Sequence, residues 1–345
     1  MILMLFLMVE RLIKTLDGSP LKTHPSCFFL SWPDHVAQWI PISQLDKSSV
    51  QFSCYVKWKE LRGEVLVATD YQGKNFTIEL DNPYTNKDYL KSHLQKVIRR
   101  SNTYKALKTA VHFIDLDLPG FLRRLSIIAL EDALPIEGYS TIIWFMSAVS
   151  KGYILSMEQI CWCLGYVYDL CQCSHYEQVD TEIEPKIKDM RLYSLSDEGK
   201  NLVYSILFRQ CYGGLKGDKS LCRVASCIWA GRYHCKSRFL PLLQRDEKFI
   251  TFPTEVLFRQ EWVIAAIDFH CCPNIIYSLL EKHDEYSEDD IRSAIWHCNS
   301  SLTNKKLIGS DMNKRTPRNE KLILIWKDIK KDCLSYARFM LEKQG

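Results

Sequence analysis

Hydrophobic residues recur at helical spacing between residues 91 and 152 of the chain. Positions three or four apart stay apolar, which is typical of amphipathic helices packed on one another. The spacing is interrupted at Pro119-Gly120, where a helix is expected to end or bend. We therefore predict three or four packed helices. The apolar positions that carry this pattern are Leu94, Val97, Ile98, Ala106, Leu107, Ala110, Val111, Ile114, Leu122, Leu125, Ile128, Ala129, Ile142, Ile143, Phe145 and Met146.

A β-type pattern precedes these helices, in residues 27–82. Short runs of alternating, β-branched or aromatic residues predict strands, and Gln72-Gly73-Lys74 before residues 75–80 predicts a hairpin. The runs lie at residues 28–30, 36–42, 50–58 and 64–71. Together they predict a small antiparallel sheet or barrel. Residues 1–26 are expected to form a short helix or strand and a turn-rich link.

From Thr85 onward the pattern is helical nearly to the end of the chain. Polar residues able to cap a helix precede several apolar runs, and we expect helices to begin near each of them. These starts are Asn86 or Thr85, Ser156, Ser196, Pro273-Asn274 and Ser287. Further helices are expected over residues 220–235, 255–270 and 320–342, with loops at 212–218 and 303–319 and an exposed acidic connection at 177–198.

These patterns predict an α+β fold: mainly an α-helical bundle with an N-terminal β-rich module. We divide the chain into a β-rich module (1–84), a collar-like helical region (85–175) and a C-terminal helical region (176–345) with a mobile basic loop near 303–319. With 345 residues, 47% of them hydrophobic and 25% charged, the composition is that of an ordinary globular protein.

Basic residues are concentrated in two stretches. Residues 86–108 carry seven Lys or Arg against one Asp, and residues 305–331 carry nine against three acids, although the net charge is only +4. Such asymmetry suits a surface that meets a polyanion. An alternative is that the arginines pair with Asp115, Asp117, Glu131 or Asp132 inside the bundle. The candidate phosphate contacts are Lys96, Arg99, Arg100, Lys105, Lys108, Arg123 and Arg124.

The fourteen cysteines are scattered over a long chain and do not form the pattern of a small disulfide scaffold. The apolar start, residues 1–9, lacks a basic segment and a cleavage site and is too short to span a bilayer. We therefore expect reduced thiols and an intracellular protein, in the cytoplasm or nucleus, with no membrane partner.

Residues 94–133 resemble the helical C-terminal collar region of the clamp-loader-related AAA+ ATPases that act in replication-associated recombination. The matching residues are Gln95, Lys96, Ile98, Arg99, Arg100, Ala106, Leu107, Phe121, Leu122, Arg123, Arg124, Leu125, Ile127, Ile128, Ala129, Glu131 and Asp132. In that family these helices form an oligomerisation collar, and the motor lies upstream. The resemblance implies a collar-like assembly or DNA-associated scaffold.

The motor itself is not expected in this chain. A phosphate-binding loop needs glycines that let backbone N–H groups approach phosphate. The nearest segment, residues 213–220, has Asp218 where that loop needs glycine, and a carboxylate there repels phosphate.

Three His/Cys doublets in the C-terminal third are weak candidates for a metal site: His234-Cys235, His270-Cys271 and His297-Cys298. Zinc needs four converging nitrogen or sulfur ligands, and spacings of roughly 25–35 residues are not those of a zinc finger. A metal-dependent enzyme that uses these doublets with Asp268 is therefore an alternative only, and no cofactor is expected apart from this zinc possibility.

The leading hypothesis is a non-enzymatic nucleic-acid-associated or assembly protein of DNA replication or recombination type. Nucleic acid, a protein partner or further copies of the chain are the partners that it implies. Whether the chain is an enzyme stays open, with the sequence favouring that it is not. A third reading is a structural module whose β-rich part binds a partner peptide.

Overall fold

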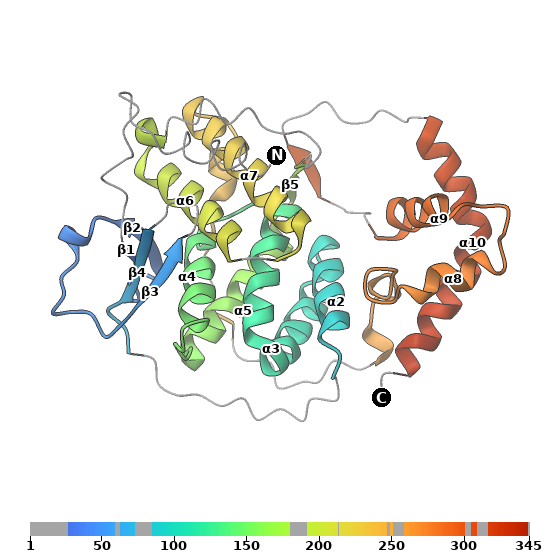
Figure 1. Cartoon of the computed structure of the whole chain (residues 1–345), viewed down its shortest axis with the longest axis horizontal. Helices are drawn as coiled ribbons and strands as arrows, with labels where there is room; N and C mark the ends of the chain where they lie inside the picture. The colour runs from blue at the N-terminus through green and yellow to red at the C-terminus, as the bar shows by residue number, and fades with distance from the viewer. Residues whose placement is uncertain are drawn as a thin grey trace. The chain divides into compact units, whose positions relative to one another are not determined.

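A computed structural model of the whole chain describes residues 27–58, 63–72, 85–179, 192–212, 214–246, 249–250, 259–300, 305–308 and 317–343. Nine α-helices and a small N-terminal sheet lie within these residues, which confirms the α+β, mainly helical class (Figure 1). The expectations for residues 1–26, for the hairpin strand at 75–80 and for most of the acidic connection fall outside the described residues.

The chain divides into two compact units that are discontinuous in sequence, rather than into three consecutive segments. Unit 1 comprises Met1–Phe76, Leu125–Cys163 and Gln178–Asp246, and unit 2 comprises Thr77–Arg124, Leu164–Glu177 and Glu247–Gly345. The β-rich module therefore shares a unit with helices from the middle of the chain.

The sheet of unit 1 has four strands in the order β2-β1-β4-β3. They are β1 (Cys27–Ser31), β2 (Val36–Ile40), β3 (Phe52–Trp58) and β4 (Gly63–Thr69), as the alternating runs predicted. The pairs β1–β2 and β3–β4 are antiparallel, but β1 and β4 pair in parallel, so the expectation of an antiparallel sheet was wrong at its centre. Pairing between strands so distant in sequence leaves no local signal.

Two helices of unit 1 pack against the sheet and against each other: α4 (Tyr139–Val149) and α6 (Asp197–Cys211). A third helix, α7 (Lys216–His234), packs against α6 (Figure 1). The buried indole of Trp144 on α4 donates to the carbonyl oxygens of Phe28 (3.0 Å) and Ala68 (3.1 Å). Trp39 stacks on Phe28, with ring centroids 4.3 Å apart. Aromatic burial thus holds the sheet to its helices.

Four of the five predicted helix starts are confirmed by side-chain caps, and the fifth, at Pro273-Asn274, is a helix start without one. Asn86 accepts from the Asp88 amide at the start of α2 (Lys87–Arg99), and Ser196 and Ser287 cap α6 and α9 (Glu288–Ile295). At α5 (Met157–Gln172) the hydroxyl of Ser156 accepts from the Gln159 amide, and the Gln159 side chain accepts from the Ser156 amide. This reciprocal pair is a capping box.

The break expected at Pro119-Gly120 is a kink inside α3 (Thr103–Glu131). Asp117 leaves helical geometry, with φ −157° and ψ 74°, and its carboxylate accepts from the Gly120 amide at 2.9 Å. The aspartate therefore caps the second segment while Pro119, which has no amide hydrogen to donate, lies in its first turn.

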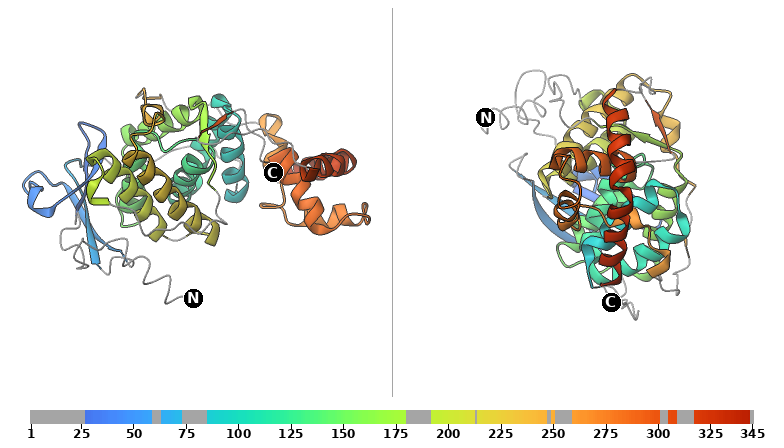
Figure 2. Two further views of the ribbon diagram at one scale, coloured as in Figure 1. Left: turned by 90° about the horizontal axis from the view of Figure 1, so that it is seen from above. Right: turned by 90° about the vertical axis from the view of Figure 1, so that its right-hand side faces the viewer.

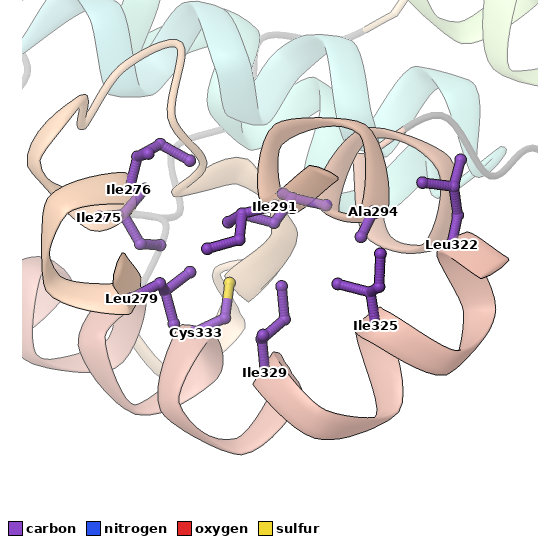
Figure 3. Close-up of a cluster of buried hydrophobic side chains, with 10 residues drawn as sticks. Ile275, Ile276, Leu279, Ile291, Ala294, Leu322, Ile325, Ile329 and Cys333 are labelled. Atoms are coloured by element: carbon purple, nitrogen blue, oxygen red, sulfur yellow. The ribbon is translucent and has the colours of Figure 1, made fainter. Parts of the chain in front are cut away.

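The last three helices of unit 2 share one apolar core. Side chains from α8 (Asn274–Leu280), α9 and α10 (Pro317–Glu342) point toward one another in Figure 3. On α10 the buried positions recur every three or four residues, which is the stripe that the sequence predicted for residues 320–342. This core consists of Ile275, Ile276, Leu279, Ile291, Ala294, Ile295, Leu322, Ile325, Ile329 and Cys333.

Three local expectations were wrong. The helix predicted over 255–270 is absent from its described part, 259–270, which holds two short 3-10 turns, η6 (Arg259–Glu261) and η7 (Ile264–Ala266). Helix α7 begins at Lys216, inside the predicted loop 212–218. Residues Lys306–Ile308 of the predicted loop 303–319 form strand β6, which pairs in parallel with β5 (His175–Glu177).

Two isoleucines of α10 provide a matched test of this core. Ile329 is fully buried and Ile323 is 43% exposed. We expect Ile329→Ala to lower the stability of the α8–α10 core by about 2–5 kcal/mol, because it removes packed methyl groups and leaves a cavity. Ile323→Ala is expected to change it by about 0.5 kcal/mol or less. Hydrogen–deuterium exchange of α9 peptides measures both, and equal effects of the two changes would contradict this packing.

Candidate functional site

The basic side chains of α2 meet a buried carboxylate inside unit 2. The ammonium of Lys96 lies 3.4 Å from the Asp268 carboxylate, and both side chains are almost fully buried. Asp268 follows η7 in the segment predicted as a helix. A buried charge is tolerated only when partners replace its lost water, so this ion pair fixes α2 to the segment that follows η7.

Two further groups complete the surroundings of Asp268. The Ser300 hydroxyl donates to it at 2.8 Å, and His270 approaches it with both its backbone amide (2.9 Å) and its ring Nδ1 (3.0 Å). Burial alone raises the pKa of Asp268, but the hydrogen bonds from His270 and the charge on Lys96 outweigh it and hold that pKa below its ordinary range. The carboxylate is therefore ionised at neutral pH.

The two arginines at the end of α2 hold a π-helical turn, η8 (Trp296–Ser300). Arg99 donates to the carbonyl oxygen of Ser300, and Arg100 donates to that of Asn299 at 2.7 Å. Arg99 is buried and Arg100 is half-buried. These guanidinium groups thus satisfy carbonyls at the end of the turn, a role that their charge pattern did not predict.

The other four predicted phosphate contacts differ in exposure. Lys108 is buried 3.3 Å from the Glu261 carboxylate, and Arg124 donates to the side-chain oxygen of Gln95. Lys105 is half-buried and Arg123 is exposed. Lys96 and Lys108 pair with Asp268 and Glu261, partners that the sequence did not suggest, because residues far along the chain fold against α2 and α3.

Helix α2 also carries a buried histidine, His93. The amide of Val263 donates to His93 Nε2 (3.0 Å), so the ring proton is on Nδ1, which donates to the Thr109 hydroxyl at 2.7 Å. Burial, together with the charges of Lys105 and Arg100, lowers the pKa of His93 to about 3. His93 is a neutral structural link between α2, α3 and the segment before η7.

The three His/Cys doublets are divided between the two units. His234 and Cys235 end α7 in unit 1, whereas the other two doublets belong to unit 2. Among the residues that the structure describes, no three His, Cys, Asp or Glu side chains are placed to share a metal ion. Burial and the nearby Asp268 raise the pKa of Cys271 to about 12, so its thiol is protonated at neutral pH. The zinc hypothesis gains no ligand set here.

Free basic charge lies instead on α10. Lys327, Lys330, Lys331 and Arg338 are exposed, and none of them is in an ion pair within the described parts of the chain. Two acids of the same helix are engaged: Asp328 accepts from the Tyr286 hydroxyl at 2.5 Å, and Asp332 from Lys282 (2.7 Å) and His283 (3.1 Å). The charge excess of residues 305–331 indicated this region, but not which side chains face outward.

Trp296, the first residue of η8, is not among the site residues that the sequence predicted. It is 39% exposed although Lys96 and Arg99 lie over its ring, 5.6 and 5.7 Å from the centroid. In the sequence this tryptophan lies in a largely apolar pattern, which is typical of a core residue. The π-helical turn alters the spacing of that pattern.

In the described residues no helix is long and apolar enough to cross a membrane. Comparisons of the chain with protein-family models, curated proteins and solved structures found no match.

Removing the charge of Asp268 tests the importance of the buried pair. We expect Asp268→Asn to lower the free energy of unfolding of unit 2 by about 3–5 kcal/mol, because Lys96 is left buried beside a neutral amide. Asp332→Asn, which breaks an exposed pair, is expected to cost about 1 kcal/mol or less. Urea unfolding of the full chain gives both values, and similar losses would show that the Asp268 pair is not the stronger constraint.

The lowered pKa of His93 predicts that acid destabilises the folded chain. Its pKa is lower in the folded than in the unfolded chain, so the unfolded state binds the extra proton first as pH falls. Its contribution to stability is therefore present above about pH 6.5 and lost between pH 6.5 and about 3, at up to about 1.4 kcal/mol per pH unit.

We expect His93→Gln to be less stable at pH 7 but to lose less stability than the wild type between pH 6.5 and 5. Urea unfolding at half-unit steps of pH measures this difference. Parallel pH profiles for the two proteins would rule out His93 as the titrating group.

Proposed function

We propose that this chain is a non-enzymatic, intracellular protein that associates with nucleic acid through the outer basic face of α10. The observation that carries this proposal is the arrangement of charge on that helix: Asp328 and Asp332 are bound to side chains of unit 2, whereas Lys327, Lys330, Lys331 and Arg338 face solvent. All fourteen cysteines lie in described residues as free thiols, which suits a reducing compartment.

The outer basic face of α10 has the spacing of a phosphate-binding strip. At 100° per residue, Lys327, Lys331 and Arg338 lie within about 40° of one another around the helix. At a rise of 1.5 Å per residue they extend over about 16 Å along it. Figure 2 shows α10 as one unbroken helix, so this strip is straight. Cations in a row can neutralise successive phosphates and release their counterions.

The basic side chains of α2 and α3 that the sequence favoured are less suited to this role. Lys96, Arg99 and Lys108 are buried and contact Asp268, the Ser300 carbonyl and Glu261. Moving them to a phosphate would leave those groups unsatisfied, which costs free energy. The setting in DNA replication or recombination rests on the collar resemblance alone and stays a prediction.

Assembly is the second candidate, and a different feature of α10 favours it. Ile323, Leu324 and Phe339 are exposed on this helix, with Leu324 at 60%. Apolar side chains at the edge of a basic strip suit contact with another protein or another copy of the chain. A Leu324→Ser variant that changes the mass measured by sedimentation velocity, without changing nucleic-acid affinity, would favour assembly.

Charge reversal tests the leading proposal. We expect Lys327→Glu, Lys331→Glu and Arg338→Glu together to weaken binding to oligonucleotides and to reduce the slope of log affinity against log salt by about two to three, because up to three phosphate contacts are lost. Fluorescence anisotropy over a salt series measures both quantities.

The matched control reverses three exposed lysines of unit 1: Lys47, Lys216 and Lys219. It changes the net charge by the same amount, so a general charge effect would weaken binding equally in both variants. Equal weakening, or no binding by the wild type at low salt, would refute α10 as the nucleic-acid surface.

A further inference from the structure

The indole ring of Trp296 is exposed and yet held in place. Lys96 and Arg99 lie over it at cation–π distance, and the ring of His270 meets it edge-on, with centroids 5.5 Å apart. Cations over an aromatic face restrict how the ring can turn. The part of the indole that faces solvent is therefore a preorganised aromatic surface rather than a freely moving side chain.

The groups around the indole are fixed by the same buried network. Asp268 binds Lys96 and His270, and Arg99 is bound to the Ser300 carbonyl at the far end of η8. The exposed tryptophan thus begins a π-helical turn whose end is fixed by the neighbouring arginines. Turns of this kind are rare and are frequent at functional sites.

His270 adds a polar edge to this surface. Its side chain is 53% exposed, and its Nδ1 lies 3.0 Å from the Asp268 carboxylate. Because an ionised carboxylate only accepts, Nδ1 carries a proton and Nε2 is left to make the next hydrogen bond. Nε2 of the neutral ring accepts a hydrogen bond, and that of the charged ring donates one.

The surrounding charges select the kind of ligand. Lys96 and Arg99 lie at the indole, so a cationic ligand such as a methylated ammonium group would be repelled. A flat, neutral ring with hydrogen-bonding groups on its edge fits the same surroundings. Nucleobases have these properties, and every base has a face that can stack on an aromatic side chain.

We infer that Trp296 and His270 form a stacking platform for one unpaired base of a single-stranded nucleic acid. The inference rests on the proposed function and specifies its partner, because the bases of a duplex are already stacked and offer no free face. Helix α10 packs against η8, with the Cys298 thiol 3.8 Å from the Leu322 carbonyl oxygen, so the platform and the basic strip belong to one group of elements.

The test is binding of the full chain to single-stranded DNA and RNA oligonucleotides containing 2-aminopurine, and to the matching duplexes. Stacking on an indole quenches the fluorescence of this base. We expect Trp296→Ala to weaken single-strand binding by about 5- to 150-fold and to abolish the quenching. The salt slope and duplex affinity are expected to stay unchanged, because stacking involves no phosphate.

Two further variants separate stacking from a loss of folding. Trp296→Phe keeps an aromatic face and is expected to retain most of the single-strand affinity. Tyr277→Ala removes an aromatic side chain that is 57% exposed on α8 and is expected to change nothing. A Trp296→Ala protein with unchanged duplex binding and unchanged single-strand affinity would overturn the platform.

The failures of the two proposals are distinguishable. If the α10 charge reversals weaken binding and Trp296→Ala does not, the platform is wrong and the basic strip stands. If the wild type binds neither single strands nor duplexes at low salt, the proposed function and the platform are both wrong.

Discussion

A carboxylate stays charged inside a protein only when nearby groups replace the water that it has lost. In unit 2 this constraint falls on Asp268, which is surrounded by Lys96, His270 and Ser300. Removing any of these partners would leave a buried charge less satisfied, so their positions are mutually dependent. The Asp268 network therefore determines how the segment from η7 to η8 lies against α2, and it fixes the orientation of both His270 and Trp296.

Internal contacts of this kind engage much of the basic cluster of α2 and α3. A run of lysines and arginines in a sequence is often read as surface charge, but the structure uses Lys96, Arg99 and Lys108 to bind Asp268, a carbonyl and Glu261. Charge that is used internally is not available to a polyanion. On α10 the arrangement is reversed, because Asp328 and Asp332 contact neighbouring side chains within unit 2 while the basic residues remain outside.

Unit 1 depends on a different interaction, the burial of aromatic rings between a mixed sheet and its helices. Trp144 joins β1 and β4 by donating to a carbonyl of each strand, and these are the two strands that pair in parallel. A parallel pair needs a long connection between its strands, so its closure depends on contacts made far along the chain. Here Trp144, which supplies the contact, lies 76 residues beyond Ala68 of β4.

Local signals determined much of this protein. Caps at Asn86, Ser156, Ser196 and Ser287, and the apolar stripe of α10, act within a few residues, so the sequence alone predicted these elements. Only the tertiary structure decided the parallel β1–β4 pairing, the 3-10 turns at residues 259–266, and which cations are buried. The physical reason is that a backbone or charged group is satisfied by whichever partner the folded chain brings to it, and Asp268 is 172 residues from Lys96 in the sequence.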